Sequence, residues 1–539
     1  MRSFWKGGDP FVWLTGAMLA LSLLMVAGLL FLVLQNGLGF FWPKHVERFR
    51  LADGSTLVGE VTEREAIPAR GADAQVPTLY RIQVKRGNRD VYGTDFVWID
   101  EAKITIRDRP RDVVVIERRE WGNFYGELKA LRQGERVVAE GPDAVWQALQ
   151  PRLAEALRLH DEIRDVEKGE IGANNYEQER LRLARRSLER RGVASGPELD
   201  AIEAEMTLLY RQYGASLKKL EGLRHGQSDR LVLSAAGDRE IDLPLDKIVS
   251  IIRPNRMSAL DKARVYLARV WEFVSADPRE SNTEGGVFPA IFGTVMTVMI
   301  MSVLVTPLGV VAAVYLREYA RQGPFVSAVR IAVNNLAGVP SIVFGVFGVG
   351  FFVYTIGGTI DRLFFADALP TPTFGTGGIL WASLTLALLT VPVVIVATEE
   401  GLAAVPRGVR EASLALAATK FETTWRVVLP AVAPSILTGL ILAMARAAGE
   451  VAPLMITGVV KLAPSLPVDG FFPYFHFERK FMHLGFHIYD VGFQSPNVDA
   501  ARPMVFTTTM LLLAIVLVLN LTAILLRNRL RRRLQVSAV

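Results

Sequence analysis

The sequence predicts an α-helical integral membrane protein with six transmembrane helices and an inserted α+β domain. Of its 539 residues, 50% are hydrophobic and 22% are charged. A soluble protein does not combine these averages, whereas a membrane protein with a large soluble domain does. Six stretches have the roughly 20 apolar residues that are needed to cross a bilayer. The long polar segment between the first two stretches, residues 44–280, is the predicted inserted domain.

The first predicted span covers residues 11–34 and belongs to an N-terminal unit of residues 1–36. This stretch is too long for a secretory signal peptide and lacks a small-residue cleavage site, so we expect it to remain as an anchor. The other five spans lie in a core of residues 285–526, and we predict them at residues 287–316, 325–354, 379–397, 434–457 and 505–526. A basic tail of residues 527–539 follows, with Arg527, Arg529, Arg531, Arg532 and Arg533.

Lys and Arg residues in the short loops predict the orientation, because cytoplasmic loops carry an excess of them. The N-terminal tail has Arg2 and Lys6, and the C-terminal tail has the arginine run. The loops on the same side contain Arg317, Arg321, Arg407, Arg410, Lys420 and Arg426. We therefore expect a multi-pass protein of a bacterial inner membrane, with both termini in the cytoplasm and residues 44–280 in the periplasm.

The inserted domain begins and ends with strand-like segments that are rich in β-branched and aromatic residues. Turns such as Asp53-Gly54 separate them. We predict strands at residues 46–51, 79–85, 96–99, 104–107 and 113–117, and again at 231–233 and 241–252. These segments predict a small β domain.

Residues 143–225 interrupt the strands with a charged helical hairpin. The second arm opens with a capping box, Ser195 to Glu198. Its apolar residues recur at steps of three and four, the pattern of a coiled-coil seam, at Ile202, Met206, Leu209, Tyr213, Leu217 and Leu220. The first arm carries a comparable stripe of Val145, Leu149, Leu153, Ile163 and Val166. The glycines of residues 192–196 should let the two arms fold back on each other.

Two charged residues lie within the fifth predicted span. Arg446 and Glu450 are four residues apart, so they share one face of a helix. A charge at membrane depth costs at least about 2.5–3.5 kcal/mol, so both side chains must face protein or a water-filled path. The pair therefore marks a functional site, or else it only locks two helices together.

The segment before this helix resembles the EAA loop of permease subunits of ATP-binding-cassette (ABC) importers, which we expect at residues 399–430. Glu411-Ala412-Ser413 takes the place of the Glu-Ala-Ala sequence, and Leu429-Pro430 closes the motif. The glycine of the family falls at Ala417, where this chain departs from the pattern. The resemblance implies that these residues couple the chain to an ATPase.

The next string of residues is similar to that of phosphate-uptake permeases in the same family. It comprises Ala445, Arg446, Gly449, Glu450, Ala452, Pro453 and Leu454. The resemblance covers about half of the chain, from Gly285 to the C-terminus. It implies the type I ABC importer permease fold, a phosphate path that includes Arg446 and Glu450, and the lipid bilayer as surroundings. The implied partners are a second permease, a dimer of ATPases and a periplasmic phosphate-binding protein.

Several kinds of chemistry have no support in the sequence. There is no phosphate-binding loop of the G-x-x-x-x-G-K-[S/T] type, so we expect ATP to be bound by the partner ATPase and no cofactor by this chain. Cysteine is absent and histidine is scarce, so we expect neither an enzyme active site nor a metal site, and no basic pattern predicts nucleic-acid binding. The alternatives are a permease for another oxyanion (sulfate or molybdate) or an amino acid, and a membrane-anchored sensor or scaffold built on the coiled coil.

Overall fold

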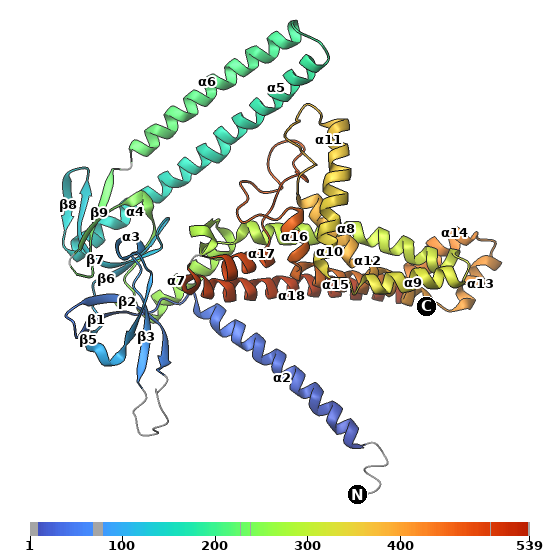
Figure 1. Cartoon of the computed structure of the whole chain (residues 1–539), viewed down its shortest axis with the longest axis horizontal. Helices are drawn as coiled ribbons and strands as arrows, with labels where there is room; N and C mark the ends of the chain where they lie inside the picture. Colours follow the sequence, from blue (N-terminus) through green and yellow to red (C-terminus); the bar gives the residue numbers. More distant parts are fainter. Residues whose placement is uncertain (1–8, 68–78, 227, 238, 496, 537–539) are drawn as a thin grey trace. The chain divides into compact units, whose positions relative to one another are not determined.

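The computed structural model describes residues 9–67, 79–226, 228–237, 239–495 and 497–536 (Figure 1). Arg2 and Lys6 of the predicted N-terminal tail lie outside the described residues. The chain divides into two units. One comprises Met1–Phe40 and Val287–Val539 and is called the helical unit here, and the other comprises Phe41–Gly286 and is called the β unit.

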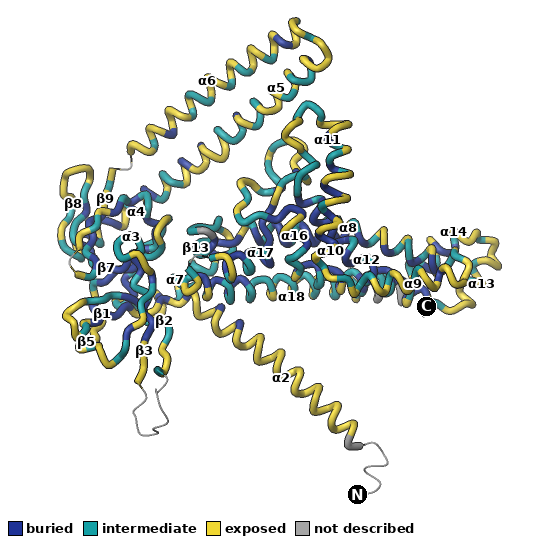
Figure 2. Tube along the Cα trace, viewed as in Figure 1, coloured by how far each residue is buried: buried dark blue, intermediate teal, exposed yellow. Residues whose placement is uncertain are grey.

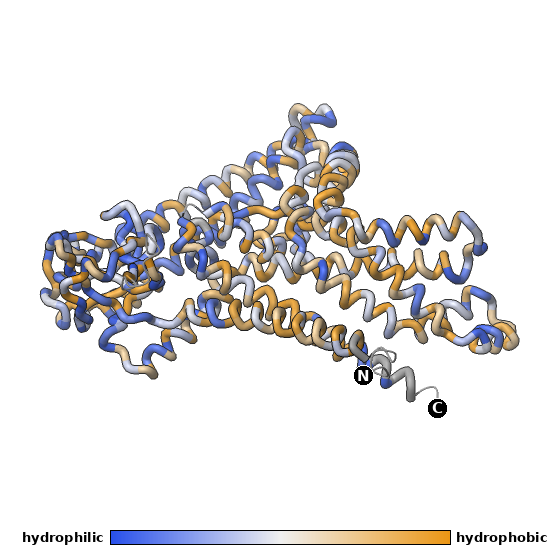
Figure 3. Tube along the Cα trace, turned by 60° about the horizontal axis from the view of Figure 1, so that its bottom comes forward, coloured by the Kyte–Doolittle hydropathy of each residue, from blue (hydrophilic) through white to orange (hydrophobic). Residues whose placement is uncertain are grey.

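Within the described residues of the helical unit, six segments are long and apolar enough to cross a membrane, as predicted. Their hydrophobic character is visible in Figure 3. They are α2 (Asp9–Gly39), α8 (Phe288–Val314) with η5 (Tyr315–Tyr319), α10 (Ser341–Phe347) with η6 (Gly348–Gly357) and α11 (Gly358–Phe364), α12 (Ile379–Ala404), α14 (Lys420–Glu422) with η7 (Thr423–Val428) and α15 (Leu429–Gly449), and α18 (Val498–Val536). Two short helical segments, α17 (Leu484–Tyr489) and η8 (Asp490–Gln494), precede α18.

The predicted third span, residues 325–354, has the wrong bounds. Residues Pro324–Leu336 form a separate amphipathic helix, α9, and the apolar span runs over Ser341–Phe364 instead. Helix α9 ends because the chain turns at Gly338, and Pro340 then takes an extended conformation before α10 begins. Proline has no backbone N–H to donate, so it suits the start of a new helix rather than the interior of a long one.

Helix α12 is the centre of the helical unit. Its apolar window is 67% buried, far more than that of any other candidate span. Neighbouring helices approach it at glycines: a Cβ on Gly309 would lie 2.6 Å from Val394, and a Cβ on Gly439 would lie 2.7 Å from Ala397. Small residues allow this close packing, which replaces the hydrophobic effect as the force between helices in lipid.

Helix α2 is exposed along most of its length within the helical unit (Figure 2). Its C-terminal end contacts α18, where Thr507 Oγ1 donates a hydrogen bond to Gly37 O over 3.3 Å. A helix that is apolar all round and exposed is suited to lipid rather than to water. The prediction that residues 11–34 span a membrane agrees with this surface.

The β unit contains two larger antiparallel sheets. The first comprises β1 (Val46–Leu51), β2 (Thr56–Ala66), β3 (Tyr80–Lys85), β4 (Phe96–Asp100) and β5 (Ile104–Asp108) in the order β4-β3-β2-β1-β5. The second comprises β6 (Val113–Arg118), β7 (Asn123–Gln133), β9 (Asp229–Ala235), β10 (Arg239–Pro244) and β11 (Ile248–Ile252) in the order β10-β9-β7-β6-β11, with β8 (Arg136–Glu140) paired to β7. Short 3₁₀ turns, η1 (Glu101–Lys103) and η3 (Leu245–Lys247), precede β5 and β11.

The helical hairpin comprises α4 (Pro142–Asp165), η2 (Val166–Ile171) and α5 (Gly172–Arg190) in the first arm and α6 (Pro197–His225) in the second. Buried Asn174 donates a hydrogen bond to Leu209 O over 2.9 Å and so fixes the register of the arms. Glu170 adds an ion pair to Lys219 at 2.6 Å. The predicted seam of the second arm is largely half-buried, because the arms form a thin two-helix rod.

The stripe predicted for the first arm divides between two partners. Ile163 and Val166 pack against Leu220 of the second arm. Val145, Leu149 and Leu153 instead pack on the second sheet of the β unit. The expectation that the whole stripe faces the other arm is therefore wrong. The first part of the arm, α4, packs on one face of the second sheet, and only the later part packs against the second arm.

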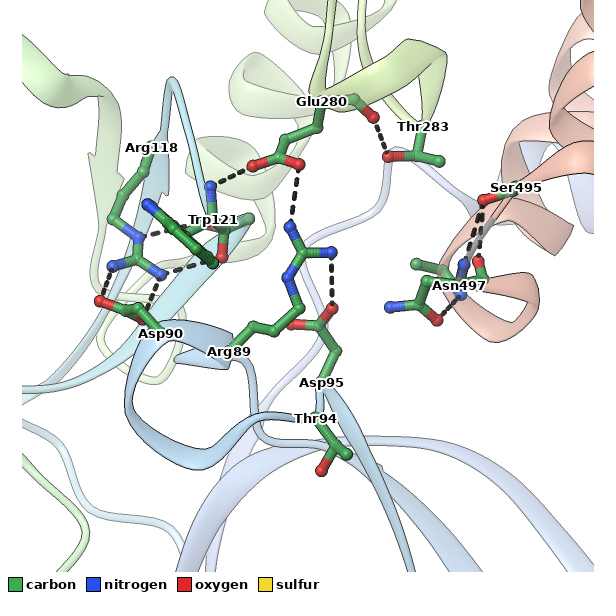
Figure 4. A network of polar contacts seen from close by, with 12 residues as sticks. Arg89, Asp90, Thr94, Asp95, Arg118, Trp121, Glu280, Thr283, Ser495 and Asn497 are labelled. Atoms are coloured by element: carbon green, nitrogen blue, oxygen red, sulfur yellow. Dashed lines mark hydrogen bonds and ion pairs between the residues drawn. The ribbon is translucent and has the colours of Figure 1, made fainter.

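A polar network connects the C-terminal segment of the β unit, which contains Glu280, to the rest of that unit (Figure 4). Arg118, which is buried, makes two hydrogen bonds of 2.9 Å to Asp90 in the short helix α3 (Arg89–Tyr92). Arg89 donates to Glu280 over 3.0 Å, and the Trp121 N–H donates to the same carboxylate. Glu280 begins the turn η4 (Glu280–Asn282) between β12 (Pro278–Arg279) and β13 (Glu284–Gly285), which follow helix α7 (Ala259–Ser275).

Candidate translocation site and coupling surface

The structure brings Arg446 and Glu450 together at the end of α15. Their closest approach is 3.6 Å between Nε and Oε1, an ion pair longer than a normal hydrogen bond. Helix α15 ends at Gly449, and Glu450 is extended, with φ −78° and ψ 137°. The expectation that both residues lie on one continuous helix face is therefore wrong. The two charges flank the point where the helix breaks.

The fifth predicted span is broken at this point, since α16 (Ala452–Thr457) is a separate short helix. It packs closely on α10, where a Cβ on Gly345 would lie 2.7 Å from Pro453 Cα. Irregular backbone at membrane depth is tolerated only where protein or a water-filled cavity surrounds it. Broken helices of this kind line the substrate sites of many transporters.

One side of α15 is open within the described part of this chain. Ala443, Ala447 and Ala448 are buried in the core of the helical unit. By contrast, Leu442 is 56% exposed and the Arg446 side chain is 32% exposed. A guanidinium cannot face lipid at low cost, so this side requires another protein surface or water. The pair joins two residues of one segment and does not lock two helices of this chain together.

The segment with the EAA-like residues forms helix α13 (Arg407–Ala415) and the turn after it. Glu411 and Ala412 are exposed, and Ser413 forms a 2.9 Å hydrogen bond with Thr423 that ties α13 to the next segment. Thr419 and Glu422 form a capping box that starts α14. Further along, Leu429 is the first residue of α15 and Pro430 stands in its first turn, as suits proline.

Ala417 adopts a left-handed conformation, with φ 61°. Glycine is the residue that adopts this conformation without steric cost, whereas an L-residue with a Cβ is strained there by roughly 1–2 kcal/mol. The family's glycine at this position thus has a physical explanation, and the chain keeps the bend in spite of the alanine.

An apolar surface surrounds this turn. Leu414, Leu416, Phe421 and Trp425 are all exposed, and Leu416 reaches 85%. The rings of Phe421 and Trp425 stack at 6.2 Å. Exposed apolar residues that gather in this way mark protein–protein or membrane interaction sites. We call these four residues with Glu411 the coupling surface.

Sequence reasoning did not identify Arg410 as a site residue, although it anchors α13. Its guanidinium donates to Glu318 Oε1 over 2.8 Å and to the carbonyl oxygens of Leu402 and Val405 over 2.8 and 2.7 Å. Arg410 thus joins α13 to the last residues of two spans, α12 and α8–η5. Its signal in the sequence was weak, because Arg410 was indistinguishable from the other basic residues of that loop.

A second ion pair lies near the C-terminal end of α12, as the Arg410–Glu318 pair does. Arg330 of α9 donates to Glu399 of α12 over 3.0 Å and to Gln322 over 3.0 Å. Both pairs are partly buried, with side-chain exposures between 12% and 30%. Among the described residues there is no cluster of three or more His, Asp or Glu side chains that could hold a metal ion.

The part of the chain that contains these residues is similar in sequence to known transport proteins. Residues 305–536 match the family model of the binding-protein-dependent transport system inner membrane component. The phosphate transport system permease protein PstA of Mycobacterium leprae is 38% identical over 172 residues, which are 32% of this chain and 51% of that protein. PstA of Yersinia pestis is 37% identical over 187 residues, or 35% of this chain and 57% of that protein.

The chain therefore spans about half the length of these curated relatives. Among solved structures, a chain of the MetNI methionine ABC transporter is 17% identical and covers 51% of this chain and 99% of its own length, with a TM-score of 0.32. The sequence matches show that residues 305–536 of this chain carry a permease region of the binding-protein-dependent transport system inner membrane component family.

Proposed function

We propose that this chain is the transmembrane permease subunit of an ATP-driven importer of inorganic phosphate. The observation that carries the proposal is the identity of 37–38% to proteins named as phosphate transport permeases. The matched family region, residues 305–536, includes both Arg446 and the coupling surface. The chain itself is not the enzyme of the system, and ATP is bound and hydrolysed by a separate ATPase.

Arg446 is the residue proposed to meet the anion. Phosphate carries one to two negative charges at neutral pH, and an arginine presents two parallel N–H donors that match its oxygens. The 3.6 Å pair with Glu450 is loose enough to exchange for a stronger contact with phosphate. Glu450 would then limit how tightly the anion is held, or accept a hydrogen bond from protonated phosphate.

The coupling surface is proposed to receive the motion of the ATPase. Arg410 bonds α13 to the ends of α12 and α8–η5, so displacement of α13 would move both spans. Glu411, Ala412 and Ser413 would seat in the ATPase, with Ala417, Leu429 and Pro430 shaping the connection to α15. The spans would then rock between inward-open and outward-open states around the Arg446 site.

The proposed assembly contains a PstC-like permease, a PstB-like ATPase dimer and a PstS-like periplasmic phosphate-binding protein. The open side of α15 with Arg446 supports the second permease, since a charged side at membrane depth requires a protein neighbour or water. We place the chain in the bacterial inner membrane with both termini in the cytoplasm, because the arginine-rich loops lie on one side of the predicted topology.

Uptake of labelled phosphate in a strain that lacks this chain tests the proposal. Restoring the chain should restore uptake, and excess sulfate should not compete. If phosphate uptake is the same with and without the chain, or if labelled sulfate or an amino acid is taken up instead, the assignment to phosphate is wrong.

A further inference from the structure

The two larger sheets of the β unit are copies of one fold. Both have the same strand order, with the last strand returning to pair with the first. The registers also correspond. Val46 pairs with Glu60 in the first sheet, and Val113 pairs with Glu127 in the second, both 67 positions later in the sequence (46 to 113, 60 to 127).

The irregular features of the two sheets correspond as well. The register shifts between Val61 and Glu63 in the first sheet and between Leu128 and Ala130 in the second. A 3₁₀ turn of three residues, η1 or η3, precedes the last strand in both. Bulges are specific features that are kept within families of related structures. The two sheets are therefore structural repeats, in which each strand of one has a counterpart in the other.

A glycine at the same position of both repeats supports this alignment of the two sheets. A Cβ on Gly59 would lie 2.3 Å from Lys85 O, and a Cβ on Gly126 would lie 2.3 Å from Ser234 O. These two glycines occupy matching positions on the second strand of each repeat, next to matching positions on the third. The backbones approach too closely at this point for any other residue.

The repeats differ in what covers one face. In the second repeat, helix α4 lies on that face and buries it with Val145, Leu149 and Leu153. In the first repeat, the matching face holds an open recess of about 520 Å³. The recess is lined by Val61, Arg64, Ile82, Glu101, Ile104 and Arg107.

The lining of this recess corresponds, residue by residue, to the surface under α4. The registers and the two 3₁₀ turns match the six lining residues, in the same order, to Leu128, Leu131, Leu231, Leu245, Ile248 and Ile251. All six of these residues are buried, with exposures of 9% or less. The same structural position is thus covered by a helix in one repeat and lacks that helix in the other, where Arg64, Glu101 and Arg107 stand in place of Leu131, Leu245 and Ile251.

The charges of the recess indicate the character of its occupant. Arg64 and Glu101 form a two-bond ion pair, with both bonds at 2.8 Å. Arg107 and Arg109 share one carboxylate, that of buried Glu47, at 2.6 and 2.9 Å. Among the lining residues, Arg64 and Arg107 are cationic and Glu101 is anionic, which leaves an excess of one positive charge. The accessible apolar part of the recess is Val61 and Ile104, which are half-buried, whereas Ile82 beneath them is only 1% exposed.

We propose that this recess binds an amphipathic α-helix of a partner protein, in the way that the second repeat binds α4. The helix would present apolar side chains at every fourth residue, as Val145, Leu149 and Leu153 do, and a carboxylate beside the surplus arginine. Helix-in-groove recognition through such spacing is a common mode of protein association.

Photo-crosslinking from the full-length chain in its native membranes tests this proposal. A photoreactive amino acid is placed at Val61, and crosslinked residues are identified by mass spectrometry. We expect crosslinks to one segment of one protein, at residues three or four apart, within a sequence that has helical amphipathic spacing. Crosslinks confined to lipid or to this same chain, crosslinks to a segment without that spacing, or no crosslinks would overturn it.

A matched pair of variants makes the test specific. Ile104→Glu places a charge in the recess and should lower the crosslinking yield at Val61 about tenfold, which corresponds to about 1.4 kcal/mol. Ile106→Glu changes an isoleucine on the same strand that is 49% exposed and does not line the recess, so the yield should stay unchanged. Equal yields in the two variants, with both chains equally resistant to protease, would contradict the proposal.

Discussion

Arg446 forms a loose and partly exposed ion pair. Its partner Glu450 lies beyond the end of α15, and the 3.6 Å separation is too long for a strong hydrogen bond. The sequence predicted the proximity of the two charges, because residues four apart meet on a helix. The break was missed although the sequence carries a signal for it, since α15 ends at Gly449 and Pro453 stands in the first turn of α16.

Replacing Arg446 tests its role in transport. Arg446→Lys keeps the charge but loses the planar pair of donors, so phosphate uptake should fall sharply while the chain still assembles. Arg446→Gln should be worse, since it leaves Glu450 without its cation. The measurement is the initial rate of labelled phosphate uptake at equal amounts of membrane-inserted chain.

The double variant Arg446→Gln with Glu450→Gln separates the transport role from a structural role. Two neutral amides can hydrogen-bond to each other, so a purely structural pair would regain function. We expect uptake to remain abolished. Near-normal uptake in the double variant would show that Arg446 does not act on phosphate.

Ala417 offers a test of local strain. Because its φ is 61°, Ala417→Gly should stabilise the turn by about 0.5–1 kcal/mol, the relief of strain being partly offset by the greater freedom of glycine when unfolded. Ala415→Gly, in the last position of α13, should instead destabilise by about 0.5–1 kcal/mol. Hydrogen–deuterium exchange over residues 407–430 should slow in the first variant and quicken in the second, and the reverse order would refute the account of the bend.

At the scale of elements, α13 is proposed to be the part that moves. It is short and exposed, and Arg410 fixes it to the ends of two spans. The sequence predicted the position of this helix through its resemblance to a family motif. The links through Arg410 and Glu318 could not be predicted, because they join residues 92 positions apart in a fold whose helix ends must first be known.

Glu411→Lys tests the coupling surface. The change reverses a charge on an exposed face, so it should abolish uptake and release the ATPase during purification without preventing membrane insertion. Glu411→Gln keeps the shape and should have a smaller effect. If Glu411 only stabilises α13 through the helix dipole, both variants would cost at most about 1 kcal/mol, and the ATPase would still co-purify.

Helix α4 belongs both to the helical hairpin and to the core of the second sheet, so removal of the whole hairpin should affect the β unit. Deleting residues 143–224 removes α4 and uncovers the second sheet. Burial of Val145, Leu149 and Leu153 is worth about 1.5–3 kcal/mol each, and their sum is comparable to the 5–15 kcal/mol that stabilise a typical domain. The β unit should therefore unfold in this deletion.

A shorter deletion is the matched control. Replacing residues 169–217 by a Gly/Ser linker keeps α4 on the sheet, and its ends are near each other because Val166 and Leu220 are in contact. This chain should keep a protease-resistant β unit, whereas the longer deletion should lose it. Equal resistance in the two chains would show that α4 is not part of the β unit's core.

For the whole molecule, the sequence predicted the class of fold and the number of spans but not the details that depend on distant contacts. Apolar length is a local property, so six spans could be counted directly. The strands β2, β7 and β8 were missed; in β2 and β7, charged residues and Gly59 or Gly126 interrupt the pattern. The single strand predicted at residues 241–252 is also wrong, because η3 divides this segment into β10 and β11. The internal repeat was also hidden, since the hairpin separates the strands of the second copy.

The central claim is that this chain transports phosphate in a process driven by ATP hydrolysis. Transport assays with purified components test this claim most directly. The chain, with the subunits that co-purify with it, is reconstituted into proteoliposomes supplied with the phosphate-binding protein, and accumulation of labelled phosphate and of labelled sulfate is followed with and without ATP. We predict ATP-dependent accumulation of phosphate and none of sulfate. Accumulation of sulfate in place of phosphate, or no ATP-dependent accumulation of phosphate by an assembled, ATP-hydrolysing complex, would contradict the account.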